Sequence, residues 1–210
     1  FTVIPLLMVF YYGLTDRSGA FTLANILAIG SSEHLKALWL SLLLAGVSTV
    51  ICLILAYPLA LILRKRHIGK GSFVVFIFIL PMWMNFLLRT MAWQTLLEKN
   101  GVINTFLTLL HLPNVATMGF EGVQLMYNSG AVLLGMVYNF LPFMVLPIYN
   151  TLVKIDDNVI NAARDLGADN YQTLTKILIP LSVPGIVSGI TMVFVPALTT
   201  FVISNLLGGS

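Results

Sequence analysis

The chain has 210 residues, of which 58% are hydrophobic and only 9% are charged. Because soluble domains carry about a quarter charged residues, this composition excludes an ordinary soluble domain and indicates a membrane protein. The formal net charge of +3 is small, so the distribution of charge along the chain is more informative than its sum.

Five apolar segments follow one another along the chain. A helix needs about 20 residues to cross the hydrocarbon core of a bilayer, and the last four segments reach this length. We interpret the shorter first segment as the remainder of a truncated span, and the chain as a fragment. Since a backbone in lipid must satisfy its own hydrogen bonds, all five segments are expected to be helical. Their approximate bounds are 1–14, 35–63, 73–97, 130–152 and 181–207.

Lysine and arginine residues predict which connections face the cytoplasm, because cytoplasmic loops carry an excess of them. Of the 11 such residues, four lie in the connection 64–72 and three in the insert 154–180. Both connections are therefore expected to be cytoplasmic, and the connections 15–34 and 98–128 to face outward. The outer connection 98–128 is long enough for a short helix from Val102 to His111.

The insert 154–180 is polar, although it lies between two apolar segments. Asp156 or Asp157 can cap a first short helix over 158–166, and Gly167 follows where helices commonly end in a left-handed residue. Its predicted apolar face consists of Val159, Ala162, Ala163 and Leu166.

Asp169 and Gln172 have the capping-box spacing for a second helix, from Asn170 to about Leu178. Its predicted apolar face consists of Tyr171, Leu174, Ile177 and Leu178. Periodicity leaves two interpretations open: the helix pair lies on its own membrane domain, or it fits a groove on a cytoplasmic partner.

The insert resembles the EAA loop of bacterial ABC importer permeases. That loop reads E-A-A, a glycine four residues after the second alanine, nine residues, and I-x-L-P. Here Asn161 replaces the glutamate and Ile179 replaces the leucine, while both alanines, Gly167, Ile177 and Pro180 match. In that family the loop forms coupling helices that dock into the ATPase subunit. The resemblance implies that the coupling residues are Asn161, Ala162, Ala163, Asp165, Gly167, Ala168, Tyr171 and Pro180.

Three further stretches, 81–89, 136–148 and 159–167, are similar to the permease subunits of spermidine/putrescine importers. The resemblance implies an all-α, polytopic transmembrane bundle of the type I ABC importer kind, with one permease domain over 1–210 and a cytoplasmic coupling-helix pair. It implies a multi-pass subunit of the bacterial cell membrane that moves polyamines by alternating access, driven by a partner ATPase.

The partners implied by this resemblance are a companion permease subunit, cytoplasmic ATPase subunits that bind ATP and Mg, and an external polyamine-binding protein, all around a lipid bilayer and without nucleic acid. This chain is expected to bind no cofactor and to catalyse no reaction. The stretch around Lys70 lacks the upstream glycine of a P-loop, since Arg64 occupies that position. His34, His67 and His111 are isolated, so no metal site is predicted.

Polar and aromatic residues within the spans are candidates for the translocation pathway, because polar groups at membrane depth are costly and often functional. Asn85 and Asn139 are favoured among them, since both lie near the outer boundary beside aromatic residues. Trp83, Trp93 and Tyr138 are candidates to hold ammonium groups by cation–π attraction. Interhelical hydrogen bonding, packing and, for Arg89, snorkelling to the headgroups are the structural alternatives. The candidate set is Trp83, Asn85, Arg89, Trp93, Tyr138 and Asn139.

Prolines interrupt several spans, and Pro142 with Pro147 is the pair that we favour for gating, because proline can kink a helix. Gly185 and Gly189 have the spacing of close helix packing.

Two other classes of transporter remain open at this point. The first is an ABC importer permease for another small solute, since none of the eight acidic residues lies deep in a span to receive a polyamine. The second is an ion-coupled secondary transporter or channel, which would require intramembrane acids or internal repeats. A membrane enzyme is the least favoured, because no catalytic motif is visible.

Overall fold

The computed structural model describes residues 3–16, 19–23, 25, 30–65, 80, 82–98, 101–109 and 126–208. In these ranges the regular structure is helical apart from one isolated bridge between Thr15 and Phe21, which confirms the all-α prediction. The chain divides into two compact units, residues 1–43 and 44–210, which we describe separately.

The first unit contains helix α1 (Val3–Gly13) and the start of helix α3 (Ser32–Lys65). No residue of α1 is buried, as expected for an apolar helix that faces lipid. At 11 residues it is too short to cross a bilayer by itself, in agreement with the short first apolar segment. The turn after it is held by Asn25, whose Nδ2 donates to the carbonyl oxygens of Tyr12 and Thr15 at 3.2 and 3.1 Å.

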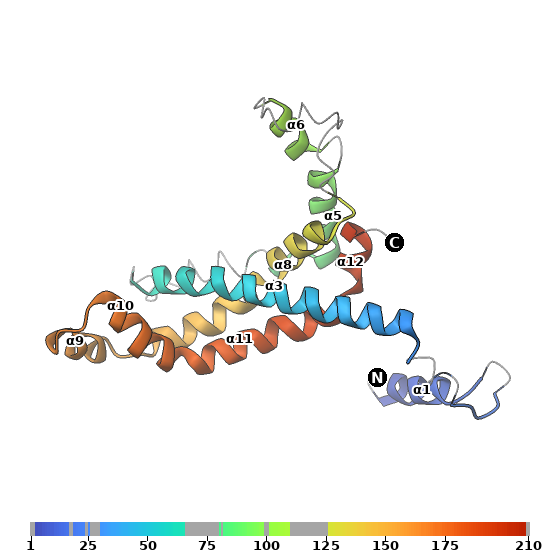
Figure 1. The fold of residues 1–210 in the computed structure, drawn as a ribbon, viewed down its shortest axis with the longest axis horizontal. Helices are drawn as coiled ribbons and strands as arrows, with labels where there is room; N and C mark the ends of the chain where they lie inside the picture. Colours follow the sequence, from blue (N-terminus) through green and yellow to red (C-terminus); the bar gives the residue numbers. More distant parts are fainter. Residues whose placement is uncertain are drawn as a thin grey trace. The chain divides into compact units, whose positions relative to one another are not determined.

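The centre of the second unit is a pair of adjacent helices, α8 (Ser129–Val153) and α11 (Ile179–Thr199) (Figure 1). They approach closely because α11 presents glycines to α8. A Cβ atom added at Gly185 would lie 2.7 Å from the carbonyl oxygen of Pro147, and one added at Gly189 would lie 3.3 Å from that of Met144. The close packing predicted from the glycine spacing is therefore confirmed. The fully buried core between these helices includes Met144, Val145, Ile148, Leu152 and Val193.

The second half of α3 packs on this pair through its side chains. Tyr57 Oη lies 3.1 Å from Ser182 Oγ on α11, and Cys52 Sγ lies 3.8 Å from the carbonyl oxygen of Val137 on α8. The small side chains Ala56 and Ala60 are fully buried, which permits this approach.

Two of the predicted spans are not single helices. In the segment 73–97, of which 73–79 and 81 lie outside the described residues, helix α5 (Phe86–Leu97) begins only after a break at Met84 and Asn85. The physical reason is local: the Asn85 side chain accepts a hydrogen bond from the amide of Leu87 at 2.8 Å and caps the new helix.

The segment 181–207 is broken at Thr200, whose ψ is 102°, and continues as α12 (Phe201–Gly208). Thr199 lies next to the break, and its Oγ1 donates to the carbonyl oxygens of Val195 and Pro196 at 3.3 Å each. Such back-bonding bends helices. The apolar run predicted a helical segment correctly but not the continuity of the helix.

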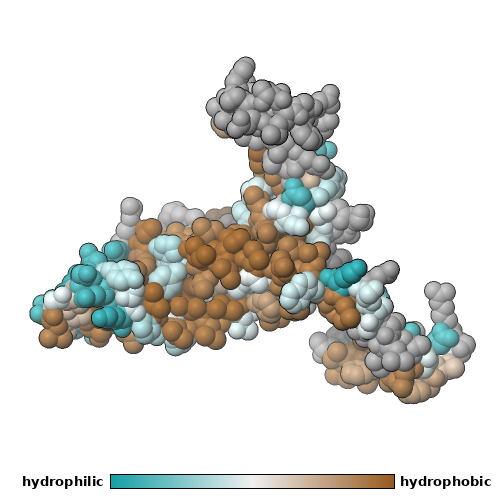
Figure 2. All heavy atoms as spheres, in the orientation of Figure 1, coloured by the Kyte–Doolittle hydropathy of each residue, from teal (hydrophilic) through white to brown (hydrophobic). Residues whose placement is uncertain are grey.

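Three described helices are long and apolar enough to cross a membrane: 34–65, 129–153 and 170–199. Figure 2 shows apolar side chains over α3 and α11 and hydrophilic ones gathered at the end formed by α9 (Asp157–Asp165) and α10 (Asn170–Thr173). Exposed apolar surface of this extent needs lipid or protein to cover it. The prediction of a membrane protein is thus confirmed. In the connection 98–128, α6 (Val102–Leu109) confirms a short helix; His111 lies outside the described residues.

Candidate functional site

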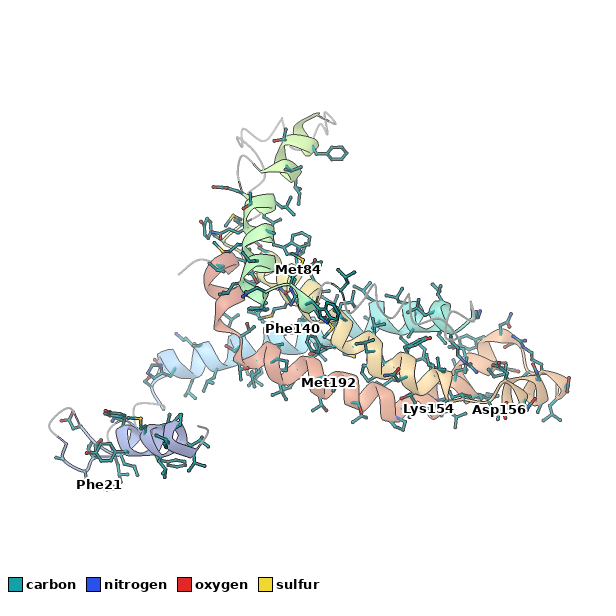
Figure 3. The ribbon with its side chains drawn as sticks, turned by 180° about the vertical axis from the view of Figure 1, so that it is seen from behind. Phe21, Met84, Phe140, Lys154, Asp156 and Met192 are labelled. Atoms are coloured by element: carbon teal, nitrogen blue, oxygen red, sulfur yellow. The ribbon has the colours of Figure 1, made fainter. Side chains whose placement is uncertain are left out.

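Helix α9 begins with a side-chain cap. Asp156 has extended backbone angles, and its Oδ1 accepts a hydrogen bond from the amide of Asn158 at 2.9 Å. Its negative charge at the helix start is also favourable to the helix dipole. Asp156 and Lys154 lie in the turn that leads from α8 into α9 (Figure 3). Of the two predicted caps, Asp156 is confirmed, and Asp157 is instead the first residue of the helix.

Helix α9 ends in a Schellman motif. Gly167 has a φ of +84°, its amide donates to the carbonyl oxygen of Arg164 at 2.9 Å, and the amide of Ala168 donates to that of Ala163 at 3.0 Å. These two bonds satisfy carbonyl groups that the helix leaves without a partner. A Cβ atom at Gly167 would meet nothing within 4 Å. The glycine is therefore required for its backbone conformation and not for space.

The predicted capping box of the second helix is confirmed. The backbone amide of Gln172 donates to Asp169 Oδ1 at 2.6 Å, and the backbone amide of Asp169 donates to Gln172 Oε1 at 3.3 Å. The predicted end of this helix near Leu178 is wrong: α10 continues through a π-helical turn, η2 (Leu174–Leu178), directly into α11. In that turn the amide of Ile179 donates to Leu174, five residues back.

The π-helical turn immediately precedes Pro180, which has no amide hydrogen. In a regular α-helix, the proline ring would clash with the carbonyl group four residues before it. The turn accommodates the proline without interrupting the helix. Helix α10 is therefore continuous with α11, and together they are long and apolar enough to cross a membrane.

The apolar faces that periodicity predicted for the insert are only partly correct. In α9 the residues Val159, Ala162 and Leu166 are exposed, and Ile160 packs against the core instead. Leu166 is 90% exposed and Tyr171 is 72% exposed. In the second helix Leu174 and Ile177 are half-buried and Leu178 is buried, as predicted. The predicted face of α9 is wrong because tertiary contacts decide which side packs against the core, and the periodicity of the segment does not contain them.

Arg64 connects the end of α3 to the start of α9. Its Nη2 donates to the carbonyl oxygen of Ile155 and to Oδ1 of Asp157, both at 2.9 Å, and its side chain is 11% exposed. Sequence analysis used Arg64 to orient the chain and to exclude a P-loop, and it did not predict this contact, because the partner Asp157 lies 93 positions further along the chain.

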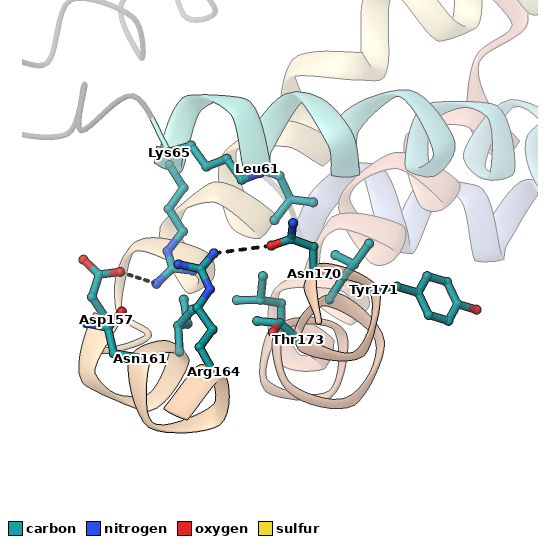
Figure 4. A pocket seen from close by; sticks show the side chains of 12 residues that line it. Leu61, Lys65, Asp157, Asn161, Arg164, Asn170, Tyr171 and Thr173 are labelled. Carbon is teal, nitrogen blue, oxygen red and sulfur yellow. Dashed lines mark hydrogen bonds and ion pairs between the residues drawn. The ribbon is translucent and has the colours of Figure 1, made fainter. Parts of the chain in front are cut away.

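A pocket of about 610 Å³ lies between the end of α3, α9, α10 and η2 (Figure 4). Arg164 of α9 reaches across to α10, where its Nη2 donates to Asn170 Oδ1 at 3.5 Å. Two of the predicted coupling residues, Asn161 and Tyr171, line this pocket. The other members of that set are distributed around it: Ala162, Ala163 and Asp165 on α9, Gly167 and Ala168 in the turn, and Pro180 at the start of α11.

The candidate pathway residues fall into two groups. Asn85 and Trp83 are exposed near the break before α5, so Asn85 caps a helix and does not lie within one. Trp93 of α5 and Tyr138 of α8 make an edge-to-face contact, with ring centroids 5.2 Å apart at an interplanar angle of 70°. The sequence placed both rings on the candidate pathway, and the structure brings them together.

Arg89 and Asn139 are both buried, at 6% and 1% exposure. Asn139 Nδ2 donates to the carbonyl oxygen of Gly135 at 2.9 Å. Its Oδ1, and Nε and Nη1 of Arg89, are buried and have no hydrogen-bond partner among the described residues. The alternative that Arg89 snorkels to the headgroups is therefore wrong, because its guanidinium lies inside the protein. Unpartnered polar atoms of this kind are costly and unusual.

Helix α8 runs without a break through both candidate gating prolines. Pro142 is buried and Pro147 is half-buried. The carbonyl oxygen of Pro147 accepts a hydrogen bond from Oγ1 of Thr151 at 2.9 Å. Their role in gating remains a prediction.

The chain belongs to the family described as binding-protein-dependent transport system inner membrane component, whose pattern matches residues 47–210. The spermidine/putrescine transport system permease protein PotB of Haemophilus influenzae is 32% identical over 100% of this chain and 73% of its own length. PotB of Escherichia coli is 35% identical over 100% of this chain and 76% of its own. The inner membrane ABC transporter permease protein YdcU of Escherichia coli is 33% identical over 89% of this chain and 62% of its own. The chain is thus a membrane permease subunit of a transport system.

Proposed function

We propose that this permease subunit forms part of an ABC importer for polyamines, with spermidine and putrescine as the substrate class. Two relatives that the whole chain matches, at 32% and 35% identity, are named as spermidine/putrescine permeases. The observation that carries the mechanism is the insert, in which one helix is joined to α3 by Arg64 and the other is continuous with α11.

In this proposal the insert 154–180 lies in the cytoplasm and docks into an ATPase subunit that binds ATP and Mg. The exposed apolar side chains of Val159, Leu166 and Tyr171 supply the contact. When the ATPase closes, it displaces α9 and α10 together. Because the displacement reaches both α3 and α11, the two spans tilt and the pathway changes from outward to inward access. The eight predicted coupling residues, from Asn161 to Pro180, act through this contact with the ATPase.

The pathway side of the proposal rests on the ring pair of Trp93 and Tyr138 together with Asn139. Aromatic faces attract ammonium groups, and the unpartnered Oδ1 of Asn139 is an acceptor for an ammonium hydrogen. Arg89 is not assigned a contact with the substrate, because its charge repels a cation. A companion permease completes the pathway, and an external binding protein delivers the polyamine.

The same Arg89 supports a second candidate, an importer for an anionic or neutral small solute. A buried guanidinium with unpartnered donors is suited to an anionic group. The name of the relative YdcU, which is 33% identical, states no substrate.

One experiment separates the two candidates. The full-length chain, assembled with its companion permease, ATPase and binding protein in vesicles, is tested for ATP-dependent uptake of labelled spermidine. We expect uptake that putrescine inhibits and that anionic solutes do not. Failure of polyamines to compete, with uptake of an anion instead, would reject the polyamine assignment and leave the permease family unchanged.

A further inference from the structure

The helix that leads from α10 into α11 is weak at its start. Pro180 and Pro184 both lie in the first turns of α11, directly after the π-helical turn η2. Each proline lacks the amide hydrogen that a regular helix directs to the carbonyl group four residues earlier, here those of Lys176 and Pro180. Prolines and π-helical turns are the usual places where helices bend. The segment 174–184 is therefore where a force on α10 would bend the helix.

A hydrogen bond from α3 reaches this weak segment between the two prolines. Tyr57 Oη lies 3.1 Å from Ser182 Oγ, and Ser182 Oγ donates to the carbonyl oxygen of Ile179 at 3.0 Å. A serine hydroxyl has one hydrogen, and that of Ser182 is used within its own helix, so Tyr57 is the donor between the two helices. Ser182 is fully buried, so water does not compete for this contact.

Helix α3 is held in place around Tyr57. The neighbouring Ala56 and Ala60 are fully buried, so the backbone of α3 packs closely at this level. Arg64, two turns further along α3, binds the carbonyl oxygen of Ile155 and the carboxylate of Asp157. The same helix thus contacts the insert through Arg64 and the start of α11 through Tyr57.

We propose that the hydrogen bond from Tyr57 to Ser182 braces the proline-weakened start of α11 against α3. With the brace in place, a displacement of α10 tilts the membrane span. Without it, part of the displacement is lost as bending within 174–184. Tyr57 is thus a positioning residue, which acts through α11 and not on the transported solute. The inference rests on the proposed function, in which an ATPase displaces the insert.

The test compares variants of the complete importer in vesicles by the uptake of labelled spermidine per ATP hydrolysed. Tyr57→Phe removes only the hydroxyl group of the brace. We expect the ratio to fall about twofold to tenfold, the change in an equilibrium that one ordinary hydrogen bond produces. Tyr149→Phe is the matched control, because it removes the hydroxyl group of a buried tyrosine on α8, and its ratio should equal that of the unchanged importer.

A second substitution separates bracing from a general loss of stability. Pro184→Ala returns an amide donor to the helix at an exposed position. Combined with Tyr57→Phe, it is expected to restore the ratio, because the stiffer helix no longer needs the brace. A fall in Tyr57→Phe that Pro184→Ala does not restore would overturn the proposal, as would equal ratios in Tyr57→Phe and Tyr149→Phe. If Tyr57→Phe fails to assemble, Ser182→Ala removes the same hydrogen bond from the other side.

Amide hydrogen exchange of residues 181–183 in the purified importer measures the brace without transport. Bending opens helical hydrogen bonds, so exchange there should be faster in Tyr57→Phe and normal in the double variant. Unchanged exchange in Tyr57→Phe would overturn the brace whatever the uptake result. If the unchanged importer takes up no spermidine, the polyamine proposal fails, and the exchange measurement still decides about the brace.

Discussion

Arg64 Nη2 and Asp157 Oδ1 lie 2.9 Å apart, although the two residues are 93 positions apart in the chain. The first is near the end of a membrane span, and the second is the first residue of the exposed helix α9. The same nitrogen also donates to the carbonyl oxygen of Ile155, so this side chain joins the end of α3 to both the turn before α9 and its first residue. In the proposed mechanism, this contact transmits a motion of α9 to α3.

The first prediction concerns this link. Arg64→Gln is expected to leave the importer assembled, because an ion pair with one exposed partner contributes only about 0.5 kcal/mol. Uptake per ATP hydrolysed should nevertheless fall, since α9 then moves without α3. The ratio of uptake to ATP hydrolysis in vesicles measures this effect. Arg64→Lys is the control that keeps the charge, and an unchanged ratio in Arg64→Gln would refute the link.

The second prediction concerns the Schellman turn at Gly167. Gly167→Val is expected to be destabilising by about 1–3 kcal/mol, because a β-branched residue is strained at a φ of +84°. The angle between α9 and α10 should change, and substrate-stimulated ATP hydrolysis should be lost while the complex still inserts. Gly167→Asn is the control, since asparagine tolerates left-handed angles. Normal transport in the valine variant would contradict the docking role.

The local signals of the insert were predictable from the sequence. The caps at Asp156 and Asp169 and the turn at Gly167 depend on residues at most a few positions apart, so their spacing alone determines them. The breaks in the helices at Asn85 and Thr200 were not predicted. A run of apolar residues indicates a segment suited to lipid, but it does not indicate whether that segment forms one continuous helix.

The pocket and the Arg64 contact could not be predicted, because they arise where α3 meets helices that follow it by more than 90 residues. The same cause explains the wrong apolar face of α9: half-buried Ile160 packs against the core through tertiary contacts, which the periodicity of the segment does not contain. The burial of Arg89 was not predicted for a related reason: it depends on how α5 packs, and no local pattern encodes that packing.

The third prediction tests the contact between α8 and α11. Gly185→Leu is expected to destabilise the purified protein by about 1–3 kcal/mol, because overpacking forces well-packed helices apart. The clash would be with Pro147 and Thr151. Ser188→Leu, at an exposed position of the same helix, is the matched control and should change thermal stability little. Equal stability of the two variants in detergent would show that the close approach is not required.

The fourth prediction tests the exposed surface of α9. Leu166 is 90% exposed, so Leu166→Asp should leave the stability of the isolated permease unchanged. Association with the ATPase subunit should weaken, because a charge is then buried in an apolar groove without a partner. Co-purification of the ATPase measures this, with Leu166→Met as the control that preserves the apolar contact. Full association of the aspartate variant would exclude Leu166 from the docking surface.

The fifth prediction concerns the ring pair and depends on the polyamine proposal. Trp93→Leu removes the ring that contacts Tyr138. A cation–π contact contributes about 0.5–2 kcal/mol, so the KM for spermidine should rise between about twofold and thirtyfold with a smaller change in the maximal uptake rate. Tyr138→Phe retains an aromatic face and should transport nearly normally. Trp39→Leu replaces an exposed tryptophan of α3 and serves as the matched control. If Trp93→Leu and Trp39→Leu give the same KM, these rings do not bind the substrate, and the acceptor role of Asn139 must account for its recognition alone.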